Sequence, residues 1–96
     1  MPDYSQGKIY KIVSTNSSKC FIGFTCQKYL SKTYGSHRTS WRKQNNKYTS
    51  RHIFDAGGTC KIVLIQSFPC KHQYQLKERE KFYIELMNCV NKICID

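Results

Sequence analysis

The sequence has few acidic residues and no long hydrophobic run. Only six Asp and Glu stand against sixteen Lys and Arg, which gives a formal net charge of +10. No apolar run approaches the roughly 18 residues of a membrane-spanning helix. The first residues, MPDYSQGK, contain no apolar segment of the kind that a secretory signal carries. We therefore expect no membrane partner, and a protein that is intracellular, in the cytoplasm or nucleus, and not secreted.

The cysteines lack the closely spaced pairs of a structural zinc site. None of the six falls in a C-x-x-C pair; they are Cys20, Cys26, Cys60, Cys70, Cys89 and Cys94. Their even number suits a disulfide framework, but without a secretory signal we expect reduced thiols. A cysteine-rich metal or redox protein is the least favoured of the three functional hypotheses considered.

The length and the charge together point to one domain and a polyanionic partner. A chain of 96 residues, 40% hydrophobic, suits a single compact domain spanning residues 1–96. A large positive charge attracts nucleic acid before any specific contact forms. We therefore expect nucleic acid as the partner, against the alternative that the charge only aids solubility.

Hydrophobic periodicity predicts three strands. Lys8–Ser14 and Lys19–Thr25 are β-branched and aromatic runs separated by the polar TNSS, which is typical of an antiparallel hairpin. Gly23 inside the second run indicates close approach of another backbone or of a ligand. Thr59–Phe68 contains the unbroken apolar run IVLI, which predicts a strand covered on both faces.

Helical spacing appears in three other segments. In Tyr29–Lys43, four residues recur on one face, namely Leu30, Tyr34, His37 and Trp41. A short helix is expected after Thr49 or Ser50, with Gly57 and Gly58 ending it. A long helix is expected over Lys71–Asn88, followed by an extended tail, CVNKICID.

The last predicted helix carries a carboxylate on its apolar face. At about 100° per residue, Glu80 falls in the middle of the face formed by Leu76, Tyr83, Ile84 and Met87. Burying a carboxylate is costly unless a positive group offsets the lost hydration. A metal ion would do this, and so would an ion pair with Arg79, Arg51 or a lysine.

The special positions, taken in order, resemble those of the GIY-YIG nuclease family. GKIYKI (Gly7–Ile12) stands for the GIY motif, and FIG (Phe21–Gly23) stands for YIG. The helical LSKTYGSHR, then EREKFYI (Glu78–Ile84), then CVNK with Asn91 follow in the family's order. The resemblance covers nearly the whole chain.

The resemblance implies an α+β fold, with a small three-stranded antiparallel sheet flanked by helices, and metal-dependent DNA endonuclease activity. It implies that Tyr10 is the catalytic base, that His37 assists with a proton or a phosphate, and that Asn91 is a polar contact near the site. Glu80 would be the ligand of one divalent cation, and a carboxylate oxygen suits Mg²⁺ or Mn²⁺. The segments near this site contain five basic residues expected to contact DNA: Lys8, Lys11, Lys28, Arg38 and Arg42.

Two site positions depart from the family pattern, besides the lesser change that Lys8 displaces the first glycine of GIY. Phe21 replaces the tyrosine of YIG, and Thr33 stands four residues before His37, where the family has an arginine. One such donor is worth about 3 kcal/mol or more in catalysis. We therefore expect a nuclease of reduced activity or, alternatively, a catalytically inactive nucleic-acid-binding module of the same fold. Arg79 and Arg51 are the candidates to replace the missing arginine.

Each candidate position also has a purely structural interpretation. Tyr10 and Phe21 would be core aromatics, His37 a hydrogen-bonded core histidine, and Thr33 an ordinary position on the helix surface. The functional interpretation predicts that Tyr10, Phe21, Thr33, His37 and Glu80 converge on one cleft. DNA specificity should be low, or supplied by an oligomer or a separate targeting partner.

Overall fold

Three antiparallel strands form the sheet, and their spatial order differs from their order in the chain. In the computed structural model, which describes residues 3–44 and 49–91, β1 (Lys8–Ser14) lies between β2 (Phe21–Thr25) and β3 (Cys60–Ser67). A central strand must be apolar on both faces, and Ile9, Tyr10 and Ile12 are all nearly fully buried. The predicted α+β class with a three-stranded antiparallel sheet is confirmed.

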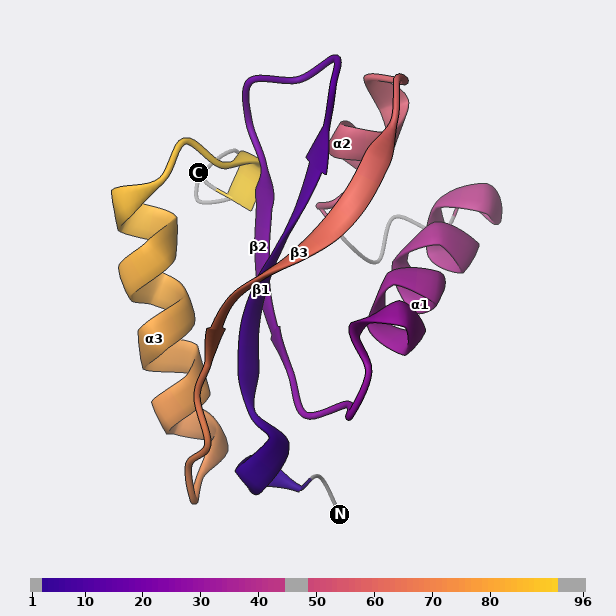
Figure 1. Ribbon diagram of the computed structural model, residues 1–96. Coiled ribbons are helices and arrows are strands. Elements are labelled where there is room, and N and C mark those ends of the chain that lie inside the picture. Colours follow the sequence, from indigo (N-terminus) through magenta and orange to yellow (C-terminus); the bar gives the residue numbers. More distant parts are fainter. Residues whose placement is uncertain (1–2, 45–48, 92–96) are drawn as a thin grey trace.

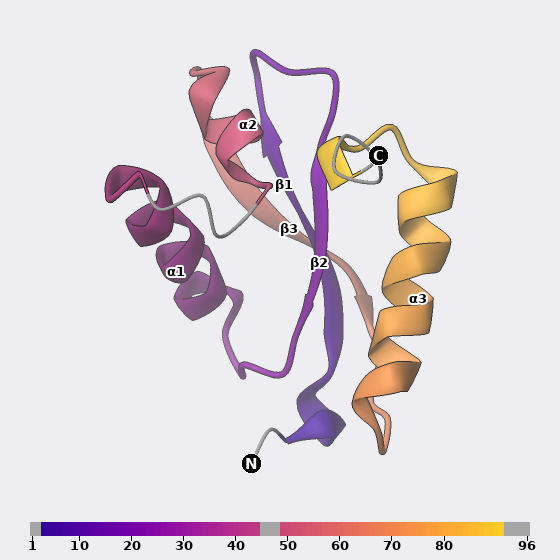
Figure 2. The same ribbon diagram turned by 180° about the vertical axis from the view of Figure 1, so that it is seen from behind.

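The helices lie on both faces of this sheet. Figures 1 and 2 show α1 (Leu30–Arg42) and α2 (Arg51–Asp55) on one side and α3 (Gln73–Leu86) on the other. A short 3-10 helix, η1 (Tyr4–Gln6), precedes β1. Because neighbouring strand residues point to opposite faces, the core has two parts. The α1–α2 face holds Tyr10, Ile12, Phe21, Ile53, Phe54 and Val90, and the α3 face holds Ile9, Cys20, Ile22, Leu76 and Cys89.

The helix bounds agree with the predicted segments to within a few residues. Tyr29 and Lys43 flank α1 as its caps. At the start of α3, the Gln75 side-chain oxygen accepts hydrogen bonds from the backbone N–H groups of Lys71 and His72, which explains the later start. Gly57 and Gly58 follow α2 with φ of 75° and 73°, a conformation that glycine adopts without strain.

The expectation that IVLI is covered on both faces is wrong. Leu64 is 47% exposed, while Ile62 packs on the α1–α2 face and Ile65 on the α3 face. The reason is the strand order: β1 occupies the centre, so β3 is an edge strand within the described part of the chain. A short apolar run does not distinguish a central strand from an edge strand whose ends alone are covered.

The segment after α3 runs along the outer edge of β2. Cys20 donates its backbone N–H to Asn88 O at 3.1 Å, and Val90 donates to Cys20 O at 2.8 Å. This parallel bridge explains why β2 begins at Phe21, two residues later than predicted. Residues 92–96 of the predicted tail lie outside the described residues. None of the helices within the described ranges is long and apolar enough to cross a membrane.

Candidate active site

The Tyr10 ring lies over Gly23. The two residues are partners in the β1–β2 register, and a Cβ on Gly23 would lie 2.5 Å from Tyr10 Oη and 2.6 Å from Cζ. Those distances are far shorter than a van der Waals contact, so only glycine fits beneath this ring. A close approach at Gly23 is therefore confirmed, but it is made by the Tyr10 side chain and not by the backbone or ligand that the sequence predicted.

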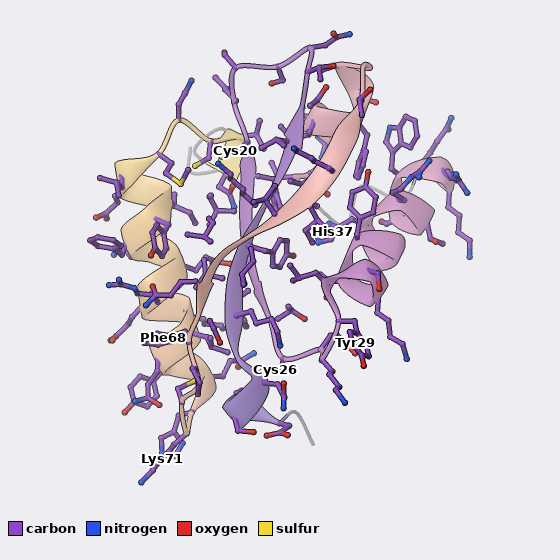
Figure 3. All side chains as sticks on the ribbon, in the orientation of Figure 1. Cys20, Cys26, Tyr29, His37, Phe68 and Lys71 are labelled. Carbon is purple, nitrogen blue, oxygen red and sulfur yellow. The ribbon has the colours of Figure 1, made fainter. Side chains whose placement is uncertain are left out.

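A chain of hydrogen bonds connects β1, α1 and the start of α2. Tyr10 Oη is 2.7 Å from His37 Nε2, and His37 Nδ1 is 2.7 Å from Ser50 Oγ. Figure 3 shows the His37 side chain reaching from α1 toward the strands. All three side chains are nearly fully buried, with exposed fractions of 3%, 3% and 1%. With its proton on Nδ1, the imidazole donates to Ser50 and accepts the phenol proton at Nε2.

Ser50 is a residue that the sequence analysis missed in this role. Its position before a short helix predicted an N-terminal cap, yet its side chain makes no cap hydrogen bond. Its hydroxyl bonds His37 instead. Helix-start signals describe the local backbone, and no local pattern indicates a partner thirteen residues away.

Phe21 contacts both Tyr10 and His37. Its ring centroid lies 6.3 Å from that of Tyr10 and 5.1 Å from the imidazole, with a tilt of 61° to the latter. At 8% exposure it belongs to the core of the α1–α2 face. Phe21 thus occupies the place beside the hydroxyl and imidazole where the resemblance would put a tyrosine.

Thr33 is not an ordinary surface residue, which corrects its structural interpretation. It is 9% exposed, and its Oγ1 lies 2.9 Å from Thr25 Oγ1. The last residue of β2 lies against the first turns of α1, so the hydroxyl is paired with β2. Its neighbours on the same helix, including His37, face the sheet as the helical spacing predicted.

Glu80 comes from α3, on the other side of the sheet. Its side chain is partly buried, and this burial raises the pKa of the carboxyl from its ordinary value of 4.5 to about 7, opposed by the nearby positive charge of Lys77. Within residues 3–44 and 49–91 the Glu80 carboxylate has no partner in a hydrogen bond or an ion pair. The inward position predicted by the helical spacing is confirmed.

Arg79 does not neutralise Glu80. Arg79 Nε donates to Gln66 Oε1 at 2.8 Å, and the guanidinium lies 4.5 Å from the Phe82 ring centroid and 5.2 Å from that of Tyr83. These contacts hold it between α3 and β3, so the predicted alternative of an Arg79–Glu80 ion pair is wrong. The same contacts place the Arg79 guanidinium beside Gln66, Phe82 and Tyr83, which is not the position expected of a substitute for the missing arginine.

The structure brings three of the five candidate positions into mutual contact. Tyr10, Phe21 and His37 meet on the α1–α2 face, and Thr33 lies one turn before His37 on α1. Glu80 belongs to the helix that covers the opposite face and makes no hydrogen bond to them. The contacts of the described residues therefore do not bring Glu80 together with Tyr10, Phe21 and His37.

Asn91 is engaged by the backbone of β2. Ile22 N donates to Asn91 Oδ1 at 2.8 Å, and Asn91 Nδ2 donates to Ile22 O at 2.8 Å. The side-chain amide therefore acts as an extra strand partner at the β2 edge. Val90, beside it, packs in the same core part as Tyr10 and Phe21. A catalytic contribution of Asn91 stays a prediction.

The five basic residues that were expected to contact DNA have different surroundings in the structure. Lys8 Nζ donates to the carbonyls of Gln6 and Gln27, at 2.7 and 2.9 Å. Lys11 alternates with Tyr10 along β1 and so points to the α3 face. The other three are exposed and lie on α1 or just before it: Lys28, Arg38 and Arg42. These three are the better placed to meet a polyanion near His37.

Comparisons of the chain with protein-family models, curated proteins and solved structures find no match. The likeness to GIY-YIG nucleases therefore rests on the motifs and their order in this sequence. In the described part of the chain, no three His, Cys, Asp or Glu residues are grouped closely enough to hold a metal ion. A cation at Glu80 would thus have at most one further ligand of these residue types in the described part of the chain.

Proposed function

We propose that this protein is a slow, divalent-metal-dependent DNA endonuclease of the GIY-YIG type that acts inside the cell. The observation that carries the proposal is the 2.7 Å hydrogen bond between Tyr10 Oη and His37 Nε2, with Ser50 on the other imidazole nitrogen. A phenol with an imidazole acceptor can take a proton from water, because its own proton has a destination. A positioned proton acceptor of this kind assists the attack of water on a phosphodiester.

In the proposed reaction, a water molecule attacks phosphorus while its proton passes to the Tyr10–His37 pair. The bond from phosphorus to the leaving deoxyribose oxygen breaks, and that oxygen takes up a proton from solvent water. Ser50 contributes by fixing the imidazole ring, so that Nε2 faces Tyr10. Lys28, Arg38 and Arg42 bind the flanking phosphates and hold the strand near the pair.

Glu80 is the residue proposed to hold Mg²⁺ or Mn²⁺. A partly buried carboxylate with no hydrogen bond or ion pair to the rest of the described chain fits this role, because a cation would offset the burial that raises its pKa. Mg²⁺ is commonly held by one or two carboxylates, with water and substrate phosphate completing the coordination. The bound cation would supply charge stabilisation at the phosphate.

The reduced rate follows from Thr33 and Phe21. Neither side chain can donate a charged hydrogen bond to the phosphate, and Arg79 is held on the α3–β3 side. Removing one preorganised donor typically lowers a rate by about 10² to 10³. Specificity would come from an oligomer or from a separate targeting partner.

A plasmid-nicking assay with Mg²⁺ or Mn²⁺ tests the proposal. Glu80→Ala and Tyr10→Phe should each lower nicking by about two orders of magnitude. Glu78→Ala is the matched control, since it removes an exposed carboxylate from the same helix and should leave nicking unchanged. Equal activity in the parent and in Glu80→Ala would refute the assigned metal ligand and point to a contaminant.

The second candidate is a DNA-binding module without catalysis, and the burial of the hydroxyl and imidazole favours it. Tyr10 and His37 are each 3% exposed, so neither meets a phosphate without a local opening. Thr33→Arg combined with Phe21→Tyr separates the candidates. In the nuclease, this double variant should gain about 10²-fold or more in metal-dependent nicking, a gain that Glu80→Ala removes. A folded double variant that binds DNA but does not nick it would establish the binding module.

A further inference from the structure

Two buried cysteines lie opposite each other at the outer edge of β2. Cys20 N donates to Asn88 O and Val90 N donates to Cys20 O, so Cys20 and Cys89 are partners in a parallel bridge. Hydrogen-bonded strands lie about 4.8 Å apart. This spacing falls within the range of about 4.4 to 6.8 Å that disulfides span between their Cα atoms.

Their side chains share one environment. Both belong to the core of the α3 face, with exposed fractions of 7% and 1%, and Figure 3 shows the Cys20 side chain between β2 and the end of α3. Burial raises the pKa of Cys20, and the nearby Cys89 raises it further. The remaining contacts of the two sulfurs are weak, to Asn88 O at 3.7 Å and to Ile84 O at 3.5 Å. Both thiols are free in the structure.

We propose that Cys20 and Cys89 are a redox modification site, at which a small-molecule disulfide such as oxidised glutathione converts the two thiols into an intramolecular disulfide. The more exposed Cys20 attacks first as its thiolate, forming a mixed disulfide and releasing one glutathione. Cys89, as its thiolate, then attacks the Cys20 sulfur and releases the second glutathione. The protein loses two protons and two electrons in total, and one glutathione disulfide becomes two thiols.

The crosslink would fix the segment that covers β2. Val90 packs with Tyr10 and Phe21, and Asn91 bonds the Ile22 backbone, so the disulfide would hold both residues in place. It would also close a long loop, because its two ends come from the start of β2 and the segment after α3. Closing such a loop should raise the melting temperature by about 10 °C or more. This inference does not rest on the proposed function.

Other cysteines provide the internal comparisons. Cys26 and Cys70 are close enough for Cys70 to raise the pKa of Cys26, yet no backbone pairing aligns them. Cys60 packs on the opposite, α1–α2 face, and its sulfur contacts the Ile53 and Gly57 carbonyls at 3.9 Å. Cys60→Ser is therefore the matched control for substitutions at the proposed pair.

The test is equilibration of the folded protein with oxidised glutathione at pH 8, followed by peptide mapping with and without reductant. Cleavage after Phe21 or Phe24 separates Cys20 from Cys26, and cleavage after Lys92 separates Cys89 from Cys94, so the two digestions together identify a link from Cys20 to Cys89. The expected result is this link, with a higher melting temperature that dithiothreitol reverses. The link should persist in Cys60→Ser and disappear in Cys89→Ser.

Three results would overturn the proposal: only glutathione adducts at Cys20 or Cys89, a dominant link from Cys26 to Cys70, or a Cys20–Cys89 link with no change in melting temperature. The mapping uses the parent sequence, so it decides the question even if a cysteine variant folds poorly. Amide exchange at Val90 gives a second readout and should slow in the oxidised protein.

Discussion

Burial of the Glu80 carboxyl lowers the stability of the folded protein by an amount that depends on pH. Its pKa is about 7 in the folded protein and near the ordinary value of 4.5 in the unfolded chain. Between these values the folded state keeps a proton that the unfolded state has lost, so stability falls as pH rises from about 4.5 to about 7. Above pH 7 the loss of unfolding free energy is complete and amounts to about 1–3 kcal/mol after solvent screening.

We therefore predict that Glu80→Gln stabilises the metal-free protein by about 1–3 kcal/mol at pH 8 and has no effect at pH 4. Urea unfolding at both pH values measures this. The exposed Glu78→Gln serves as the control and should change stability little at either pH. A gain for Glu80→Gln that is equal at pH 4 and pH 8 would contradict the assigned pKa. Adding Mg²⁺ at pH 8 should stabilise the parent more than Glu80→Gln.

Gly23 is the second residue with a predictable effect. A Cβ there would lie 2.5 Å from Tyr10 Oη, so Gly23→Ala must displace the ring from β2 and lengthen its bond to His37. We expect a loss of about 1–3 kcal/mol in unfolding free energy, together with lower nicking if the proposed function holds. Thermal unfolding and the His37 imidazole resonances would report the two effects.

Gly35→Ala is the contrasting control. This glycine lies within α1, and a Cβ there would meet nothing within 4 Å. Alanine favours a helix interior over glycine by about 0.5–1 kcal/mol, so this variant should be more stable than the parent. Equal effects of the two substitutions would mean that the Tyr10 ring does not occupy the space above Gly23.

At the scale of elements, the segment after α3 acts as an additional partner for β2. Asn91 satisfies both the N–H and the C=O of Ile22, each at 2.8 Å. Asn91→Ala should cost about 1–3 kcal/mol, because it leaves backbone groups of a largely buried strand without a protein partner. Urea unfolding and amide exchange at Ile22 would measure the loss.

Asn88→Ala provides the comparison within the same segment. Asn88 contributes its backbone carbonyl to Cys20, and its side chain is exposed, so the substitution should change stability little. If Asn91→Ala leaves both stability and Ile22 exchange unchanged, the side-chain amide does not hold the edge of β2.

At the scale of the whole molecule, the net charge of +10 predicts salt-sensitive DNA binding. Each phosphate neutralised by Lys or Arg contributes about −0.9 to the slope of log K against log salt on duplex DNA. Fluorescence anisotropy between low and moderate salt should show a steep loss of affinity with little dependence on sequence. Flat salt dependence would contradict DNA as the partner.

Single substitutions locate the DNA surface. Arg38→Ala and Arg42→Ala should each make the slope of log K against log salt shallower by about 0.9, which is the contribution of one phosphate contact. Lys71→Ala removes the same charge near the start of α3, on the side of the molecule away from α1 (Figure 3), and should leave the slope unchanged. Equal effects of all three would indicate binding by net charge alone.

Much of the fold was predictable because the signals are local. The Lys8–Ser14 strand agrees with the prediction at both ends, and α1 lies one residue inside the predicted segment at each end. Alternation and helical spacing also predicted that Glu80 and His37 face inward. Local patterns fix which side of an element a residue occupies, so these expectations hold without knowledge of the neighbours.

The partners of those residues depended on the tertiary structure. The sequence by itself determined the net positive charge, the strand and helix segments, the close approach at Gly23 and the inward position of Glu80. Only the assembled fold decided that Ser50 bonds His37, that Thr33 pairs with Thr25, that β3 lies at the edge and that Cys20 lies opposite Cys89. Those contacts arise from the order of strands and the docking of helices, and both depend on packing between residues far apart in the chain.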